Sequence, residues 1–454
     1  MPMACCSSKR AANLASLHEG GSEADGGSLR KNFEAVDMKF DQVELDKLDI
    51  TVIDGDRGKN YPHKDELLNT GYCLFLSANN VTKNGFEFSN NVYITKEKDD
   101  ALHNGRLSRN DIVITTRGTV GNVGIYDETI KFEHMRINSG MLIVRCGQNI
   151  DNRFLYNVLR SKDFASQIDS IRTGSAQPQL PKSHFLKMVV PSIPLHFQRR
   201  IANILGALDD KIALNQQINK NLEEQAQAIF KAWFMDSPDR YTWDTGTFSE
   251  IIESTLGGDW GKESPIGKYT EMVYCIRGAD IQDVNSGNKG KMPTRFILPN
   301  NYKNKRLIAD DIVVEISGGS PTQSTGRVAA VTQSLLDRYD KGMVCTNFCR
   351  AIKPKQGYSM FIYYYWQFLY GQNVFFSYEN GTTGIKNLDL NGFISNEKII
   401  LPPQKLITEF DNICKAFSSI IFSNGLENER LANLRDALLP RLMSGEIDVS
   451  KIEL

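Results

Sequence analysis

The chain repeats itself, and this duplication constrains its fold more than any other feature. GDRGKNYP at 55–62 returns as GDWGKESP at 258–265, and RLSRNDIV at 106–113 returns as RLIADDIV at 306–313. Further along, GSAQPQL ending at Leu180 is matched by GTTGIKNL ending at Leu388. The blocks occur in the same order in both halves. A repeat of this kind indicates that one structural module is present twice.

Each copy ends in a segment with the spacing of a long amphipathic helix. Apolar residues recur every seven positions in both copies, which is typical of a coiled-coil seam. They are Ile201, Leu208, Leu222 and Ile229 in the first copy, and Phe410, Phe417, Leu431 and Leu438 in the second. The segment from 201 to 233 would form roughly 50 Å of helix, the length of about 15 base pairs of DNA.

The heptad position left open is an asparagine in both helices, Asn215 in the first and Asn424 in the second. If the helices pair antiparallel, these two residues face each other at the middle, and a hydrogen bond between them would fix the register. The alternative is that each asparagine faces solvent and that Gly425 merely kinks the second helix.

The globular part of each copy is expected to be α+β. DIVITTRGTVGNVGIYD at 111–127 and DIVVEISGG at 311–319 have β-branched runs broken by glycine, which predict a twisted sheet. Segments 151–168 and 359–376 have helical spacing and are expected to pack on that sheet. The predicted parts are a disordered N-terminal extension at 1–36, globular regions at 37–195 and 244–400, helices with their linkers at 196–243 and 401–445, and a tail at 446–454.

Composition excludes several classes of protein. A formal net charge of −1 gives no overall attraction to nucleic acid, so a DNA-binding surface would have to be local. The longest apolar run, at 361–370, is too short to span a bilayer, and no secretory signal is present, so a cytoplasmic protein is expected. The eight cysteines lack the spacing of a zinc site; Cys345 and Cys349 could share a helical face, but the expectation is no metal site.

No catalytic motif emerges. GGDWGKES has Glu263 where a phosphate-binding loop needs Ser or Thr, and neither a cofactor loop nor a catalytic motif of a DNA methyltransferase occurs. Asp209 and Lys211 resemble part of a nuclease site but lie on a predicted coiled-coil helix, where charges are usually solvated. All six histidines fall in the first half, so they cannot be a general base shared by both copies. No catalytic residue is predicted, which favours a binding protein.

With these features in place, the chain resembles the specificity subunit of Type I restriction-modification systems, the HsdS family. The resemblance covers nearly everything after residue 37. Its most specific parts are LDDKIALNQQINKNLEEQAQAIFKAWF at 208–234 and LRDALLPRLMSGEIDV at 434–449. The chain departs from the family pattern in its N-terminal extension and in a shorter approach to the second helix at Gln404–Leu406.

The resemblance implies two target-recognition domains, each a twisted β-sheet with packed helices, separated by two long antiparallel coiled-coil helices in a pseudo-twofold repeat. Each domain would read one half of a split, asymmetric DNA sequence. Two modification subunits carrying S-adenosylmethionine would dock on the chain, and in complexes that also cleave DNA restriction subunits that use ATP and Mg²⁺ would join them; no cofactor is expected in the chain itself.

Candidate DNA-binding residues are polar or basic and lie beside glycines, where the backbone can approach phosphate. They are Arg57, Lys59, Asn60, Arg117, Gln177 and Gln179 in the first copy, and Lys262, Ser317, Thr382, Thr383 and Lys386 in the second. The lysine shared by both GDxGKxxP blocks is expected to touch phosphate, because two different half-sites cannot share one base contact. For each residue the alternative is an ordinary turn or surface position.

Two other classes of function remain open at this point. One is a coiled-coil scaffold whose heads bind protein. The other is an enzyme, a methyltransferase or nuclease with degenerate motifs. The first predicts no DNA affinity even with partners present, and the second predicts activity of the purified chain.

Overall fold

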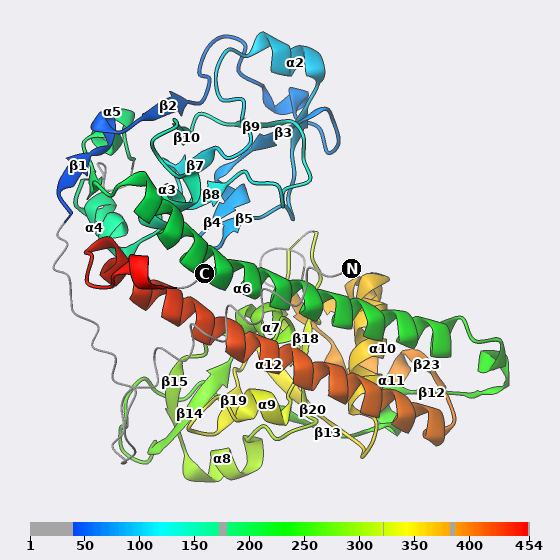
Figure 1. Ribbon diagram of the computed structural model, residues 1–454. Helices are drawn as coiled ribbons and strands as arrows, with labels where there is room; N and C mark the ends of the chain where they lie inside the picture. Colours follow the sequence, from blue (N-terminus) through cyan, green and yellow to red (C-terminus); the bar gives the residue numbers. More distant parts are fainter. Residues whose placement is uncertain (1–39, 172–178, 321, 382–385, 453–454) are drawn as a thin grey trace, which may run out of the picture. The chain divides into compact units, whose positions relative to one another are not determined.

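The computed structural model describes residues 40–171, 179–320, 322–381 and 386–452 (Figure 1). The chain divides into two compact units: unit 1 comprises residues 1–211 and 431–454, and unit 2 comprises residues 212–430. Each unit contains one globular head and a portion of each of two long helices, α6 (Leu195–Phe230) and α12 (Gln404–Met443). The predicted N-terminal extension at 1–36 lies outside the described residues.

The described part of the head of unit 1 is built from short strands and short helices. Its main sheet has the strand order β2-β10-β7-β8, a second sheet has the order β6-β3-β9, and two strand pairs are β1-β11 and β4-β5. The strands are β1 (Gln42–Glu44), β2 (Ile50–Asp54), β3 (Cys73–Leu76), β4 (Val81–Thr82), β5 (Gly85–Phe86), β6 (Tyr93–Ile94), β7 (Ile112–Thr115), β8 (Val123–Ile125), β9 (Met135–Ile137), β10 (Met141–Cys146) and β11 (Val189–Pro191); the helices are α2 (Lys96–Ala101), α3 (Asn152–Leu159), α4 (Lys162–Ile171) and α5 (Lys182–Leu186).

The head of unit 2 has sheets with the strand orders β13-β20-β16-β18, β15-β14-β19, β12-β23 and β17-β22-β21. Its strands are β12 (Asp244–Thr247), β13 (Ile252–Gly257), β14 (Glu271–Ile276), β15 (Thr294–Ile297), β16 (Ile312–Glu315), β17 (Ser317–Gly318), β18 (Val328–Ala330), β19 (Met343–Cys345), β20 (Cys349–Pro354), β21 (Glu379–Asn380), β22 (Lys386–Leu388) and β23 (Lys398–Leu401). Its helices are α7 (Ile281–Asn285), α8 (Pro299–Lys305), α9 (Gln333–Leu336), α10 (Ser359–Gly371) and α11 (Leu390–Asn396).

The two heads share one topology. Each has a four-stranded antiparallel sheet in which equivalent strands occupy equivalent places. Each also has a three-stranded sheet with one parallel pair, β3 with β9 in unit 1 and β14 with β19 in unit 2. The predicted α+β fold and internal repeat are therefore confirmed, and the repeat extends to strand order and direction.

The repeated block RLSRNDIV/RLIADDIV forms the same tight turn before the central strand of each main sheet. Asn110 and Asp310 adopt positive φ angles of 71° and 75°, which short polar side chains tolerate. The next residue, Asp111 or Asp311, is buried and accepts a hydrogen bond from the backbone N–H three positions earlier, at 2.7 and 2.8 Å. Backbone geometry explains why this block is so similar in both halves.

Each of these buried aspartates also binds a cation from the neighbouring strand. Asp111 holds Arg145 of β10 in a two-pronged contact at 2.7 and 2.8 Å, and Asp311 pairs with Lys353 of β20. Burial raises the pKa of the Asp311 carboxyl, and the nearby Lys353 only partly opposes this rise. The turn and its cation thus fasten adjacent strands together in both heads.

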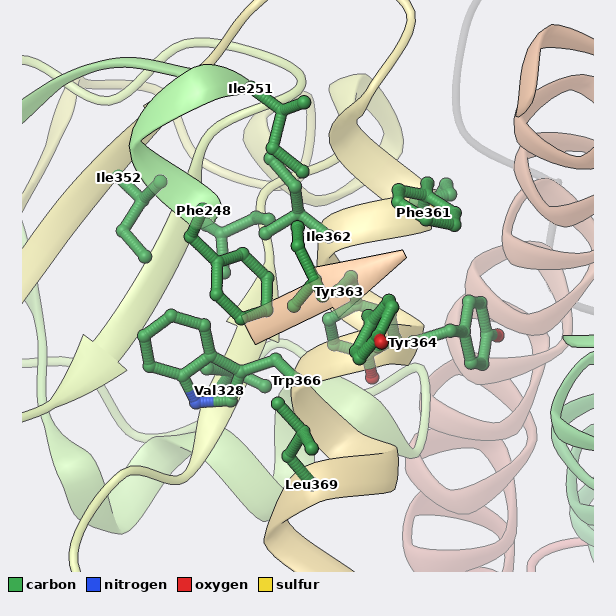
Figure 2. Close-up of a cluster of buried hydrophobic side chains, with 14 of the residues drawn as sticks. Phe248, Ile251, Val328, Ile352, Phe361, Ile362, Tyr363, Tyr364, Trp366 and Leu369 are labelled. Atoms are coloured by element: carbon green, nitrogen blue, oxygen red, sulfur yellow. The ribbon is translucent and has the colours of Figure 1, made fainter. Parts of the chain in front are cut away.

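Helix α10 forms the centre of the unit 2 core (Figure 2). Its sequence, SMFIYYYWQFLYG, is apolar on nearly every face, as expected for a helix buried on all sides. Figure 2 shows Trp366 and Phe248 among the labelled side chains between this helix and the sheet residues Val328 and Ile352. The Trp366 indole N–H donates to the Gly326 carbonyl at 2.8 Å, which satisfies its polar atom inside the core.

Helices α6 and α12 pack antiparallel within each unit. In unit 1, Arg435 of α12 bonds Asp209 of α6 at 2.6 Å. In unit 2, the rings of Phe230 and Phe410 lie 5.8 Å apart, while Asn219 donates to the Ile421 carbonyl at 3.1 Å. The two helices therefore run in opposite directions. The predicted seam residues Ile201, Leu208, Phe410, Leu431 and Leu438 are buried.

The central asparagines occupy the helix interface, but their partners differ from the predicted ones. Asn215 is fully buried and donates to Asn428 at 2.9 Å and to Glu427 at 2.7 Å. Asn424 donates to Asn219 at 2.8 Å. This register pairs four asparagines, whereas one with Asn215 opposite Asn424 would pair only two and leave buried amides unsatisfied, at a cost of about 1–3 kcal/mol each.

Gly425 lies within the continuous helix α12 and has a packing role. A Cβ atom at this position would overlap the carbonyl oxygen of Gly287, in the loop that follows α7. Arg338 donates to the same carbonyl at 2.8 Å and binds Glu429 of α12 at 2.6 Å. The glycine therefore allows the head of unit 2 to pack directly against the backbone of α12.

The suggestion that Cys345 and Cys349 share a helical face is wrong. Cys345 ends β19 and Cys349 begins β20, because the β-branched residues around them favour strands. Both are buried. In the described part of the chain, no helix combines the length and apolarity required to cross a membrane.

Candidate nucleic-acid interface

Each head has a loop built on the GDxGK sequence, residues 55–59 in unit 1 and 258–262 in unit 2, here called the GDxGK loop. Its first glycine lies against a backbone carbonyl, so a Cβ on Gly55 would overlap Asn138 and a Cβ on Gly258 would overlap Thr346. The aspartate then accepts from the second glycine N–H, Gly58 to Asp56 at 2.9 Å and Gly261 to Asp259 at 3.0 Å. Most of the identity between the two blocks is thus explained by loop geometry.

The lysine that follows is exposed in both loops. Lys59 has no ion-pair partner among the described residues, and the Lys262 ammonium lies 5.6 Å from the centre of the Tyr269 ring. A lysine that stays exposed at the same place in both loops suits a contact with phosphate, which does not depend on base sequence.

The neighbouring candidates in the unit 1 loop, Arg57 and Asn60, form hydrogen bonds with other residues of the same head. Arg57 bonds Asp54 at 3.1 Å and the Ser139 carbonyl at 3.4 Å, yet its side chain remains 52% exposed. Asn60 donates to the Ala101 carbonyl at 2.9 Å. Arg57 is available to a ligand in this geometry, whereas Asn60 contributes to the loop's own structure.

A second segment, called the paired edge, is built in the same way in both heads. In unit 1, Arg117 lies two residues beyond the end of β7 and forms an antiparallel β-bridge with Gln179. In unit 2 strand β17 pairs with β22, so that Ser317 lies opposite Asn387 and Gly318 opposite Lys386. The scaffold is the same because Leu180 N–H donates to Thr116 and Leu388 N–H donates to Ile316, at 3.0 and 2.9 Å.

One turn joins the GDxGK loop to the paired edge in each unit. In unit 1 this turn is 138–140: Gly55 packs on Asn138, and the Gly140 carbonyl accepts from Thr116 at 2.7 Å and Arg117 at 3.2 Å. In unit 2 it is 346–348: Gly258 packs on Thr346, and the Phe348 carbonyl accepts from Ile316 at 2.9 Å. The turn therefore connects the GDxGK loop to the paired edge in each head.

The paired edges differ in chemistry. Unit 1 presents the exposed Arg117 guanidinium beside Gln179. In unit 2 the Ser317 hydroxyl bonds the Asn387 side chain at 2.8 Å, and Lys386 bonds Glu379 at 2.7 Å. Burial would raise the pKa of the Glu379 carboxyl, but hydrogen bonds from Lys386 and Thr325 outweigh it and hold that pKa below its usual value. One edge thus carries a cation with no ion-pair partner among the described residues, and the other carries a lysine paired with a carboxylate.

The structure places several of the predicted residues close together, and others lie outside the described residues. Arg57, Arg117 and Gln179 adjoin one turn in unit 1, and Ser317 and Lys386 share one strand pair in unit 2. Gln177, Thr382 and Thr383 lie outside the described residues. Sequence reasoning overlooked Asn387 and Phe348, although aligning the two copies residue by residue would have placed them opposite Gln179 and Gly140.

The histidine, cysteine and acidic side chains bear on whether the chain could be an enzyme. Among the described residues, no cluster of three or more His, Cys, Asp or Glu side chains is arranged to hold a metal ion. Burial raises the pKa of the Cys349 thiol to about 11 and that of Cys275 to about 12. Asp209, considered above as part of a nuclease site, is bound by Arg435 at 2.6 Å and Arg160 at 3.6 Å.

Fold and surface together define a class: a duplicated α+β protein with two like heads and an antiparallel helix pair. Comparison with known proteins names the relatives. A family model described as the Type I restriction modification DNA specificity domain matches residues 48–224. The Type I restriction enzyme MjaIX specificity subunit of Methanocaldococcus jannaschii is 22% identical over 365 residues, which cover 75% of this chain and 78% of that protein.

The Type I restriction enzyme HindI specificity subunit of Haemophilus influenzae is 23% identical over 471 residues, covering 87% of this chain and 98% of that protein. Among solved structures, the S subunit of a Type I restriction-modification system from M. genitalium matches with a TM-score of 0.52 at 16% identity, covering 91% of this chain and 98% of that one. The chain is thus similar in sequence to Type I restriction enzyme specificity subunits, and its fold is that of the S subunit from M. genitalium.

Proposed function

We propose that the chain is the DNA sequence-recognition subunit of a Type I restriction-modification complex and reads a split, asymmetric site, one half with each head. The observation that carries the proposal is the pair of equivalent edges. Both are built on the same hydrogen-bonded scaffold, yet one presents Arg117 and Gln179 and the other Ser317, Asn387 and Lys386. Two like scaffolds with unlike polar side chains suit two different half-sites.

Within each head, the GDxGK loop and the paired edge would have different roles. The exposed lysines of the GDxGK loops, Lys59 and Lys262, would bind phosphate and position the head. The paired edges would face the bases, where an arginine such as Arg117 can bond guanine and amide side chains can bond adenine. Helices α6 and α12 would set the spacing of the two half-sites, since α6 alone is roughly 54 Å long at about 1.5 Å per residue.

The chain itself would be non-catalytic and would act in the cytoplasm. Its relatives are named specificity subunits, which supports this assignment. Two modification subunits that use S-adenosylmethionine would dock on it, and two ATP- and Mg²⁺-dependent restriction subunits would join in complexes that cleave DNA. The purified chain should therefore neither methylate nor cut DNA when supplied with S-adenosylmethionine and Mg²⁺. Activity under these conditions would support the enzyme alternative.

Methylome sequencing of the host with and without this gene tests the proposal directly. A split motif with two dissimilar halves should be methylated only when the gene is present. Unchanged methylation would overturn the proposal. If the assembled protein also shows no DNA affinity, the alternative of a scaffold with protein-binding heads would be favoured.

The role of the shared lysine has its own test. Lys59→Ala should weaken binding to all sequences alike and reduce the salt slope by about one unit, because one phosphate contact is lost. Lys47→Ala, which removes a 66%-exposed lysine of the same head, serves as the matched control. A changed recognition sequence at full affinity would refute the phosphate role.

A further inference from the structure

Phe348 is an exposed aromatic residue that the fold does not explain. It lies in the turn between β19 and β20, next to the exposed Asn347, and the turn is bounded by Thr346 and Cys349, which are 3% and 0% exposed. Phe348 is 61% exposed, whereas Phe361, Phe375 and Phe393 of the same unit are fully buried. No other ring or cation packs on it within the described residues. Single exposed apolar side chains are common on protein surfaces, so a binding role for Phe348 rests on where it lies in the fold.

The position of Phe348 connects it to the proposed interface. Its carbonyl accepts from the Ile316 N–H at 2.9 Å, directly before Ser317 of the paired edge. Two residues before it, Thr346 packs on Gly258, and the Asp259 N–H donates to Cys345 at 2.8 Å. The aromatic ring therefore rises from the turn that joins the GDxGK loop to the paired edge of unit 2.

The equivalent position in unit 1 is Gly140. The match is structural, because the Gly140 carbonyl accepts from Thr116 just as the Phe348 carbonyl accepts from Ile316. A benzyl group in one head thus replaces a hydrogen atom in the other, on a turn whose backbone is otherwise the same. A side chain needed to stabilise the turn would be expected in both heads, so the difference points to what each head contacts.

We infer that Phe348 reads an apolar feature of the half-site bound by unit 2, namely the 5-methyl group of a thymine. The inference rests on the proposed DNA-recognition function. In the major groove the edges of adenine, guanine and cytosine present polar groups, and the thymine methyl is the apolar one that a phenylalanine ring can contact. Arg117 next to Gly140 suits a polar base edge in the other half-site.

The test uses the chain assembled with its methyltransferase subunits and duplexes carrying the motif found by methylome sequencing. Each thymine in turn is replaced by deoxyuridine, which lacks only the methyl group. At one thymine of one half-site, this change should weaken binding about three- to tenfold, as expected for losing one buried methyl contact. Phe348→Ala should cause a similar loss on thymine DNA and no further loss on the matching uridine DNA.

Controls separate this contact from other effects. Tyr241→Ala removes another exposed aromatic of unit 2, 86% exposed, and should keep both full affinity and full sensitivity to uridine. Phe348→Leu should retain part of the affinity, and the melting temperature of all three variants should match that of the parent. Arg117→Ala should alter base preference in the opposite half-site.

Several outcomes would overturn the inference. They are a half-site without thymine, unchanged affinity of Phe348→Ala, a loss that is the same on thymine and uridine DNA, and loss of methyltransferase subunits from the Phe348→Ala complex. Each can occur while the parent complex still binds its motif. Absence of any sequence preference in the parent complex would instead contradict the proposed function itself.

Discussion

The two heads fold alike but differ where they would meet DNA. Unit 1 and unit 2 share the order and direction of their strands, the turn at Asp111 and Asp311, and the packing of a glycine on a carbonyl in the GDxGK loop. They differ at Arg117 and Ser317, and at Gly140 and Phe348. Identity between the copies thus falls mainly where the backbone needs one geometry, the shared lysine of the GDxGK loop being the exception, and the copies diverge at the paired edge and in the turn beside it.

The largest difference in stability is expected from removing the buried aspartate of the shared turn. Asp311→Ala would leave Lys353, only 16% exposed, without its partner, and the Ile308 N–H without an acceptor, at a cost of about 3 kcal/mol. Asp111→Ala should cost less, about 2 kcal/mol, because Arg145 is 39% exposed and can turn towards water.

Urea unfolding of both variants measures this difference between the heads. The Asp→Asn variants keep an acceptor oxygen for the backbone N–H, so each should lose less than its alanine counterpart. A greater loss for Asp111→Ala than for Asp311→Ala would show that the two turns are not fastened as described.

A second comparison contrasts two glycines of unit 2. Gly425→Ala should destabilise the protein by about 1–3 kcal/mol, because the new methyl group overlaps the Gly287 carbonyl and forces α12 and the loop apart. Gly371→Ala is the matched control, since nothing lies within 4 Å of its added Cβ. Thermal unfolding of both variants should show a lower melting temperature for Gly425→Ala alone.

The asparagine pairs permit a test with equal numbers of substitutions. Asn215→Leu with Asn428→Leu removes one complete pair and leaves Asn219 bonded to Asn424. Asn215→Leu with Asn424→Leu breaks both pairs, so it should be less stable by about 1–2 kcal/mol. Equal stability of the two double variants in denaturant unfolding would argue against the reciprocal register.

The smallest effect concerns acid pH. The Gly58 N–H, helped by those of His103 and Asn104, lowers the pKa of Asp56 in the folded loop, although burial opposes this. Since the folded pKa lies below the unfolded value of about 3.9, the stabilisation is present above about pH 4 and is lost as pH falls through the folded pKa. The stability gap between the parent and Asp56→Asn should therefore shrink only in acid, as followed by urea unfolding at a series of pH values.

Much of this arrangement follows from sequence, because a repeat with helical and strand-like periods admits few folds. The α+β heads and the seam residues such as Leu208 and Phe410 were predictable in this way. The partners of the central asparagines were not predictable from sequence. Asn215 can lie opposite an asparagine in more than one register of the helix pair, and the registers differ in how many buried amides are hydrogen-bonded. Asn387 and Phe348 were missed because motif searching favours residues beside glycines, and the turn at 346–348 contains none.

The reciprocal asparagines also have a consequence for how such a chain can change over time. Asn215 is equivalent to Asn424 in the repeat, and Asn219 is equivalent to Asn428. The pairs Asn215–Asn428 and Asn219–Asn424 are therefore equivalent to each other, and each copy of the module supplies one asparagine to each pair. An insertion between the two asparagines of one helix alone would move one of them away from its partner. A change of length at this place therefore requires a matched change in the other helix, and this ties the two halves of the gene to each other.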